Sequence, residues 1–403
     1  MHREIVEKKR WMDESQFLHA LNFCMLLPGP EAQQLATYLG WRLHGIRGGL
    51  VAGLLFIVPS VLILMVLAWI YMAFGDVPAI EGIFHGLEPA VIAVVAAAVL
   101  KIGGKSLRSA SLWAIAVMAF VGIFWLKISF VFIILGAAIL GLLGARFYPS
   151  QFPSKSGGNE LAGAHDDANY AQLPVVPKPT WSRNFKVASI GVMLWVIPLV
   201  AVGGILGWKG VHFQEGLFFS KAAMITFGGA YAVLPYVAQQ AVDTHGWLST
   251  TEMLAGLGLA ETTPGPLVIV LQFVGFAGGW NHPPAGWTPG ASAVLGALVT
   301  VWATFVPCFV FIFLGGPYVE GLREKKGIAN ALSAITAAVV GVILNLAVVF
   351  AIVALHPQTG EWDYFTAVMS VIAFVALVRF KVDLIPVLLT CAGTGWLWSL
   401  TIM

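Results

Sequence analysis

The feature that most constrains this chain is a series of long apolar segments. Residues 49–74, 187–206, 291–314 and 331–355 contain no Asp, Glu, Lys or Arg. A membrane-spanning helix needs about 20 such residues. The whole sequence is 59% hydrophobic and 10% charged, whereas soluble domains carry about 25% charged residues. Because the segments are rich in Ala, Leu, Val and Gly, they suit packed helices better than barrel strands. The sequence predicts an all-α polytopic integral membrane protein.

Several other classes are disfavoured. The N-terminal stretch MHREIVEKKRWMDESQ is charged and precedes no apolar region with a small-residue cleavage site, so no signal peptide is expected. A net charge of +2, with the cations in short loops, argues against a nucleic-acid partner. Cys24, Cys308 and Cys391 are isolated and are expected to fill apolar space. His residues fall mostly in predicted loops and receive no role. We therefore expect no metal, no cofactor and no enzymatic activity.

The chain consists of two hydrophobic halves written in the same order. Residues 146–185 are rich in Pro, Ser, Gly and charge, which is typical of an exposed linker; it separates a first repeat (1–145) from a second (186–403). Pro28-Gly29-Pro30 recurs as Pro264-Gly265-Pro266 at an offset of 236 residues. GGLVAGLLFIVPS (48–60) matches GALVTVWATFVPC (296–308) at an offset of 248, and Lys127 matches Lys381 at 254.

Each PGP motif is expected to break a helix. Asp13 and Ser249 resemble N-caps, and the helix that each begins runs into prolines, which remove backbone donors. Short cytoplasmic loops accumulate Lys and Arg. The cations fit this rule best if each PGP segment is a re-entrant hairpin, if a further hairpin spans 216–242, and if the N-terminus and linker are cytoplasmic. The halves then form two inverted-topology repeats whose broken helices meet near the membrane midplane, which is typical of secondary transporters.

A helix that begins inside the membrane exposes unpaired N–H groups, and anions bind there. We place the second proline of each motif at the first helical position, which frees the amides of Glu31, Ala32, Leu267 and Val268. Kinks or close helix contacts would explain the same glycines and prolines without any ligand. Expected substrate-binding residues are Pro28, Gly29, Pro30, Lys221, Thr226, Gly228, Gly229, Pro264, Gly265 and Pro266.

Charged residues in these segments are few. Lys221 could attract an oxyanion or could anchor the helix at the lipid interface. Glu261 is the first candidate for proton coupling, because an intramembrane carboxylate is costly without a task. Glu31 is the second candidate, although an acid in a first helical turn also simply favours the dipole. Polar residues that could line a pathway or join helices are Gln33, Gln34, Thr226, Thr262, Thr263, Gln272 and Asn345.

The stretches EKKRWMDESQFLHALNFCMLLPGPEAQQ and FFSKAAMITFGGAYAVLPYVAQQ, the latter followed by ETTPGP, resemble the two homologous domains of long bacterial chromate ion transporters. This resemblance implies a multi-pass inner-membrane protein that exports chromate and confers chromate resistance, with proton coupling often proposed. It carries the FGG motif onto Phe227, Gly228 and Gly229. By the 236 offset, the first-half FGG element would precede residue 1. Either the reading frame begins upstream, or this member works without that element.

Two alternatives to chromate export stay open. Backbone donors and one lysine would discriminate poorly between chromate and sulfate or another tetrahedral dianion, and an anion channel is a weaker candidate. Moving a dianion outward across an inside-negative membrane releases roughly 4.6 kcal/mol per 100 mV, twice the single-charge figure. Charge therefore favours efflux. The expected partners are chromate or a similar oxyanion and the lipid bilayer, and the sequence also allows a homo-oligomer.

Overall fold

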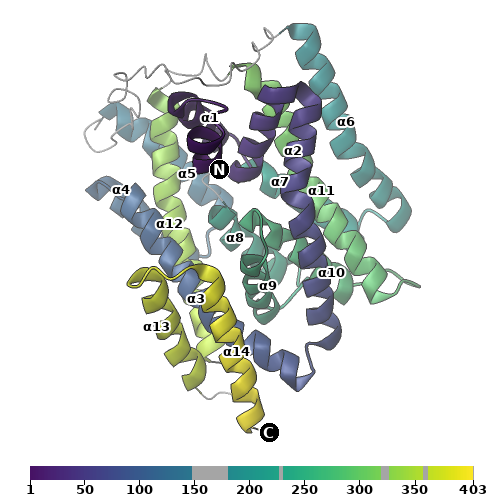
Figure 1. Ribbon diagram of the computed structural model, residues 1–403, viewed down its shortest axis with the longest axis vertical. Coiled ribbons are helices and arrows are strands. Elements are labelled where there is room, and N and C mark those ends of the chain that lie inside the picture. Colours follow the sequence, from purple (N-terminus) through teal and green to yellow (C-terminus); the bar gives the residue numbers. More distant parts are fainter. Residues whose placement is uncertain (148–179, 227–229, 319–325, 357–361, 403) are drawn as a thin grey trace.

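The computed structural model describes residues 1–147, 180–226, 230–318, 326–356 and 362–402. Every regular element in these ranges is a helix (Figure 1). The α-helices are α1 Glu14–Leu26, α2 Glu31–Phe74, α3 Pro78–Ser106, α4 Ala110–Phe124, α5 Phe130–Phe147, α6 Trp181–Leu206, α7 Val211–Ile225, α8 Ala230–Ala238, α9 Thr250–Thr262, α10 Val270–Asn281, α11 Pro289–Gly315, α12 Lys326–Leu355, α13 Tyr364–Val378 and α14 Leu384–Ile402. Short elements are η1 Arg3–Lys8, η2 Gln239–Thr244 and η3 Leu267–Ile269. Within these described ranges, five helices are long and apolar enough to cross a membrane, so the predicted all-α polytopic class is confirmed.

Both PGP motifs interrupt a helix where the proline chemistry predicts. α1 ends at Leu26 and α2 begins at Glu31, while α9 ends at Thr262 and η3 begins at Leu267. The preceding helices also start at equivalent positions, because Asp13 and Ser249 are their N-caps and accept hydrogen bonds from the amides of Gln16 and Glu252. The expected hairpin at 216–242 starts earlier than predicted, since α7 begins at Val211.

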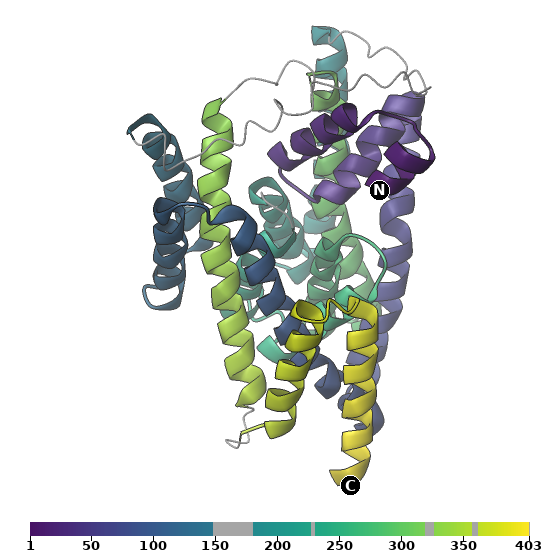
Figure 2. The same ribbon diagram turned by 60° about the vertical axis from the view of Figure 1, so that its left-hand side comes forward.

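α2 is two helices that fold back on each other. His44 and Gly45 leave the helical conformation, and Gly45 has a φ of 64°, which glycine adopts without penalty. The two arms then pack so closely that a Cβ on Gly40 would lie 2.3 Å from the Gly48 carbonyl oxygen. The first arm therefore turns back at residues 44–45, and the second arm runs the length of the molecule (Figure 2).

The second arm of α2 and α11 run antiparallel side by side (Figure 1). A Cβ on Gly49 would meet the ring of Phe313, and a Cβ on Gly53 would meet the ring of Phe309. Residue numbers therefore rise along α2 as the numbers of the facing residues of α11 fall. Residues 48–60 and 296–308 are sequence counterparts. The members of this one pair of equivalent helices therefore point in opposite directions.

The final hairpin of each half packs on the other half. α4 and α5 lie against α12, whereas α13 and α14 lie against α3 (Figures 1 and 2). The turns within these hairpins match, since Lys127 and Lys381 both have a left-handed φ, of 52° and 53°. Their amide-to-carbonyl bonds also correspond at the offset of 254: Trp125 and Leu126 to Val121, Ile128 to Gly122, Arg379 and Phe380 to Val375, and Val382 to Ala376. The inverted repeat stays a prediction, and the matching turns of the two final hairpins are consistent with it.

Candidate functional site

The first PGP motif is held by contacts with both halves. Gly29 has a φ of 117°, a conformation that side chains rarely adopt. Its N–H donates to the Thr226 carbonyl over 2.8 Å. The buried Gln34 side chain turns back and donates to the Pro28 carbonyl over 2.6 Å. These bonds fix the break between α1 and α2 against the C-terminal end of α7.

The second PGP motif has the corresponding geometry. Gly265 has a φ of 142°, and the Ser60 hydroxyl of α2 donates to the Pro264 carbonyl. Pro264 and Gly265 are exposed, while Pro266 is buried. The break between α9 and η3 is therefore held by the other half of the chain and is open on one side.

The central glycine of each PGP motif packs on a residue of the opposite half, and the two contacts correspond to each other. A Cβ on Gly29 would lie 2.6 Å from Cys308 Sγ, and a Cβ on Gly265 would lie 1.9 Å from Ser60 Oγ. Gly29 and Gly265 are counterparts at the 236 offset, and Ser60 and Cys308 are counterparts at 248. Cys308, expected to be an apolar filler, is buried at the first of these contacts. Each break therefore needs glycine for its conformation and for its clearance.

The helix starts differ from the prediction by one residue. Pro30 and Pro266 are N-caps, with ψ of 105° and 129°, rather than first helical residues. In α2 the amides without a partner in the helix are consequently those of Glu31, Ala32 and Gln33. Along the antiparallel pair of α2 and α11, Cys308 lies opposite residue 54, which is six residues from Ser60. The two breaks are thus separated by roughly 9 Å along these helices.

Three threonines near the breaks donate their hydroxyl hydrogens to backbone carbonyls at the ends of their own helices. Thr226 donates to Ala222 O over 2.5 Å, and Thr262 and Thr263 donate to Leu259 and Ala260 over 2.7 and 2.8 Å. A hydroxyl has one hydrogen. In this arrangement the backbone amides, and not these side chains, are the donors that remain for an anion.

The charged candidates lie in different environments. Glu261 is half-buried beside the second break and accepts a hydrogen bond from the Tyr231 hydroxyl over 2.7 Å. Glu31 is half-buried in the first turn of α2. Lys221 is exposed on α7. The pKa of His245 is lowered, first because His245 is partly buried and second because of the positive charge of Lys221. The predicted residues Phe227, Gly228 and Gly229 lie outside the described residues.

The structure also contains a buried polar cluster that sequence reasoning missed. Glu215 and His212 of α7 and Ser292 of α11 are each at most 1% exposed. The one available signal was a carboxylate within residues 211–225, and the expected hairpin began one residue after it.

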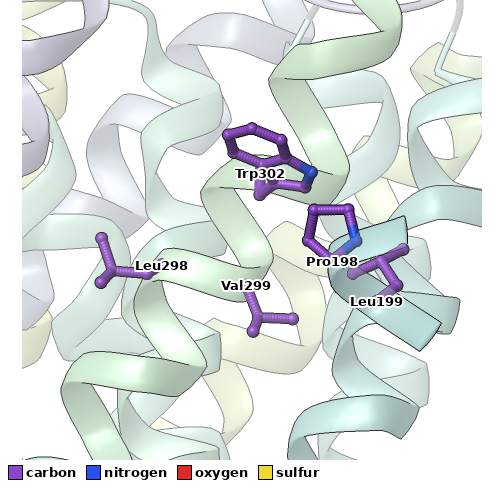
Figure 3. Close-up of a pocket in the computed structure, with 5 residues that line it drawn as sticks. All are labelled: Pro198, Leu199, Leu298, Val299 and Trp302. Atoms are coloured by element: carbon purple, nitrogen blue, oxygen red, sulfur yellow. The ribbon is translucent and has the colours of Figure 1, made fainter. Parts of the chain in front are cut away.

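A pocket of about 170 Å³ between α6 and α11 is unsuited to an anion (Figure 3). Pro198, Leu199, Leu298, Val299 and Trp302 line it. The indole N–H of Trp302 already donates to the Leu194 carbonyl over 3.0 Å, which Pro198 leaves without its usual helical donor. This pocket is an apolar recess braced by a helix-to-helix hydrogen bond.

Comparison with known proteins extends these observations. The sequence profile described as "Chromate transporter" matches residues 1–142 and 213–396. The chain is 29% identical to a probable chromate transport protein of Synechococcus elongatus, over 88% of this chain and 79% of that protein. It is 27% identical to a chromate transport protein of Cupriavidus metallidurans, over 94% and 82% of the two chains, and 28% identical to one of Pseudomonas aeruginosa, over 98% and 86%. No solved structure matches.

Both matched ranges of the profile contain a PGP motif, and together they cover well over half of the chain. The helices long and apolar enough to cross a membrane are consistent with a family of transporters. This protein therefore belongs to the chromate transporter family.

Proposed function

We propose that this protein is a secondary transporter that exports chromate across the bacterial inner membrane, with its substrate site at the two PGP breaks. The observation that carries the proposal is the reciprocal packing of Gly29 on Cys308 and of Gly265 on Ser60. It holds two helix starts against the opposite halves of the chain, each with first-turn amides that have no partner within the helix. Relatives described as chromate transport proteins supply the substrate class.

The chemistry of the breaks suits a tetrahedral dianion. Backbone amides at a helix start present donors and the positive end of the helix dipole. Irregular backbone at membrane depth is tolerated where it lines a cavity or is buried in protein. The antiparallel course of the second arm of α2 and α11 supports the inverted arrangement in which such sites lie near the midplane.

Efflux and proton coupling are the finer parts of the proposal. Outward movement of a dianion is favoured by roughly 4.6 kcal/mol per 100 mV in a cell with an inside-negative potential. Glu261 is the coupling candidate beside the second break, and its hydrogen bond with Tyr231 gives a proton change there a structural consequence. Glu31 is the corresponding carboxyl beside the first break.

A transporter of sulfate or another tetrahedral dianion is the competing function, because amides alone distinguish such ions weakly. The deciding experiment measures labelled chromate accumulation by everted membrane vesicles, energised or not, with excess sulfate as competitor. Gly265→Val tests the site, and Gly393→Val is its matched control because no atom lies within 4 Å of an added Cβ there.

We expect energy-dependent uptake that sulfate does not abolish, its loss in Gly265→Val, and its retention in Gly393→Val. Complete competition by sulfate would favour the other dianion. Absence of uptake by wild-type protein confirmed in the membrane would contradict chromate export, and full transport by Gly265→Val would place the site elsewhere.

A further inference from the structure

A buried chain of polar groups crosses from α7 to α11. His212 Nδ1 lies 3.4 Å from Glu215 Oε2, and His212 Nε2 lies 3.1 Å from Ser292 Oγ. The Ser292 hydroxyl also lies 2.6 Å from the Gly279 carbonyl of α10. Glu215 is 0% exposed, and its Oε1 has no hydrogen-bond partner among the described residues. An unpartnered carboxyl oxygen at such depth is costly and calls for an explanation.

Hydrogen-bond geometry fixes the number of protons in this chain. Ser292 must donate its single hydrogen to the Gly279 carbonyl, so its oxygen accepts the Nε2–H of His212. His212 Nδ1 then faces Glu215 either as a second N–H or as a lone pair. In the first state an imidazolium meets a carboxylate, and in the second a neutral ring accepts the O–H of a carboxylic acid. The pair holds one exchangeable proton in both states.

Glycines shape the space around the carboxyl group. A Cβ on Gly278 of α10 would lie 2.4 Å from Glu215 Oε1, and one on Gly296 of α11 would lie 2.9 Å from Oε2. Neither glycine brings a charge. If the shared proton left, a buried carboxylate would remain with no cation in contact among the described residues, which is unfavourable. Loss of the proton therefore favours a rearrangement of α7, α10 and α11.

Those three helices also carry the substrate-site contacts. From Glu215, α7 continues eleven residues to Thr226, the partner of Gly29. From Gly278, the chain leads back eleven residues to Leu267 at the second break. From Gly296, α11 continues twelve residues to Cys308. At about 1.5 Å per residue, all three paths measure roughly 16–18 Å. A shift at the Glu215 end is thus transmitted by rigid helices to both breaks.

The cluster lies behind a polar pocket at the same end of α7. This pocket has a volume of about 310 Å³ and is lined by Lys209, Val211, Gln214, His245, Trp247 and His282. Trp247 is also next to the cluster, because a Cβ on Gly278 would lie 3.3 Å from its Cβ. Among the described residues, the charged or titratable groups near this end include those of the pocket, Asp243 two residues before His245, Lys221 on α7 and Glu252 of α9, which accepts from Asn281. Trp247 therefore lines the pocket and also lies beside Gly278, next to the cluster.

We propose that Glu215 and His212, positioned by Ser292, form a proton-binding site that couples transport, loaded from the pocket beside His245 and His282. In one step a proton from pocket water forms the O–H of Glu215 or the second N–H of His212, and in the return step it goes back to water. No other bond is made or broken. This inference rests on the proposed chromate transport and adds a second proton-binding site, distinct from Glu261.

The test uses purified full-length protein in liposomes, with the membrane potential clamped. One assay measures exchange of labelled for unlabelled chromate, which requires no net proton movement. The other measures chromate accumulation driven by a pH gradient. Glu215→Gln keeps the shape of the carboxyl and cannot release a proton. Glu81→Gln, at an exposed position of α3, is the matched control.

We expect Glu215→Gln to exchange chromate within about twofold of wild type and to lose at least tenfold of gradient-driven accumulation, with Glu81→Gln unchanged in both assays. The proposal is overturned if Glu215→Gln still accumulates chromate in response to the pH gradient. It is also overturned if wild-type protein exchanges chromate but shows no gradient-driven accumulation. Failure of wild type to exchange chromate instead overturns the proposed function. If Glu215→Gln does not insert, Ser292→Ala decides: a shifted pH profile of accumulation with intact exchange supports the proposal, and an unshifted profile overturns it.

Discussion

Replacing Gly265 by alanine tests whether the second break is held by the first half. The new Cβ would lie 1.9 Å from Ser60 Oγ and 3.0 Å from Ser60 Cβ, and the residue would keep a φ of 142°. Backbone strain of this kind costs about 1–3 kcal/mol, and overpacking adds about 1–3 kcal/mol. Gly265→Ala should therefore lower the free energy of unfolding by about 2–6 kcal/mol, measured by detergent titration in mixed micelles.

Two further variants separate the contributions. Gly45→Ala has a positive φ and no atom within 4 Å of the added Cβ, so it should show only the strain of about 1–3 kcal/mol. Ser60→Gly removes both clashing atoms, and the double-mutant cycle should return a favourable coupling of about 1–3 kcal/mol with Gly265→Ala. A loss no larger than that of Gly45→Ala, or a coupling near zero, would refute the reciprocal packing.

Other consequences follow from single contacts. Trp302→Phe leaves the Leu194 carbonyl without its donor and should lower the free energy of unfolding by about 1–3 kcal/mol; an unchanged value would mean that water replaces the indole. Asp363→Ala removes the N-cap of α13 and should cost about 0.5–2 kcal/mol in the same titration. Lys221→Ala should raise the half-saturation concentration for chromate in vesicles, and an unaltered value would make it an interfacial anchor. Glu261→Gln removes the carboxylate beside the second break that accepts from Tyr231 and should abolish the dependence of chromate accumulation on the proton gradient; full retention would make Glu261 structural.

The positions of the helix breaks could be predicted because their causes are local. Two prolines and a glycine forbid a continuous helix wherever they occur, and the capping residues Asp13 and Ser249 mark where the preceding helices start. The offsets of 236 and 248 also paired equivalent residues. They could not indicate that Gly29 packs on Cys308, because a repeat states which residues correspond and not which ones touch.

The Glu215 cluster was missed for two physical reasons. Residues 212, 214 and 215 lie before the hairpin expected at 216–242, whereas α7 begins at Val211. The glycines that make room for the carboxyl lie far along the chain, at 278 and 296. Only the packing of α7 against α10 and α11 reveals that this carboxylate is enclosed.

The measurement that tests the central claim most directly is the location of chromate in the protein, by anomalous scattering from chromium in crystals grown with chromate. The account predicts a peak between the start of α2 and the start of η3, within hydrogen-bond reach of the free amides of residues 31–33 or 267–268. Chromium bound only in the pocket lined by Lys209, His245 and His282, with none at the PGP breaks, would contradict it.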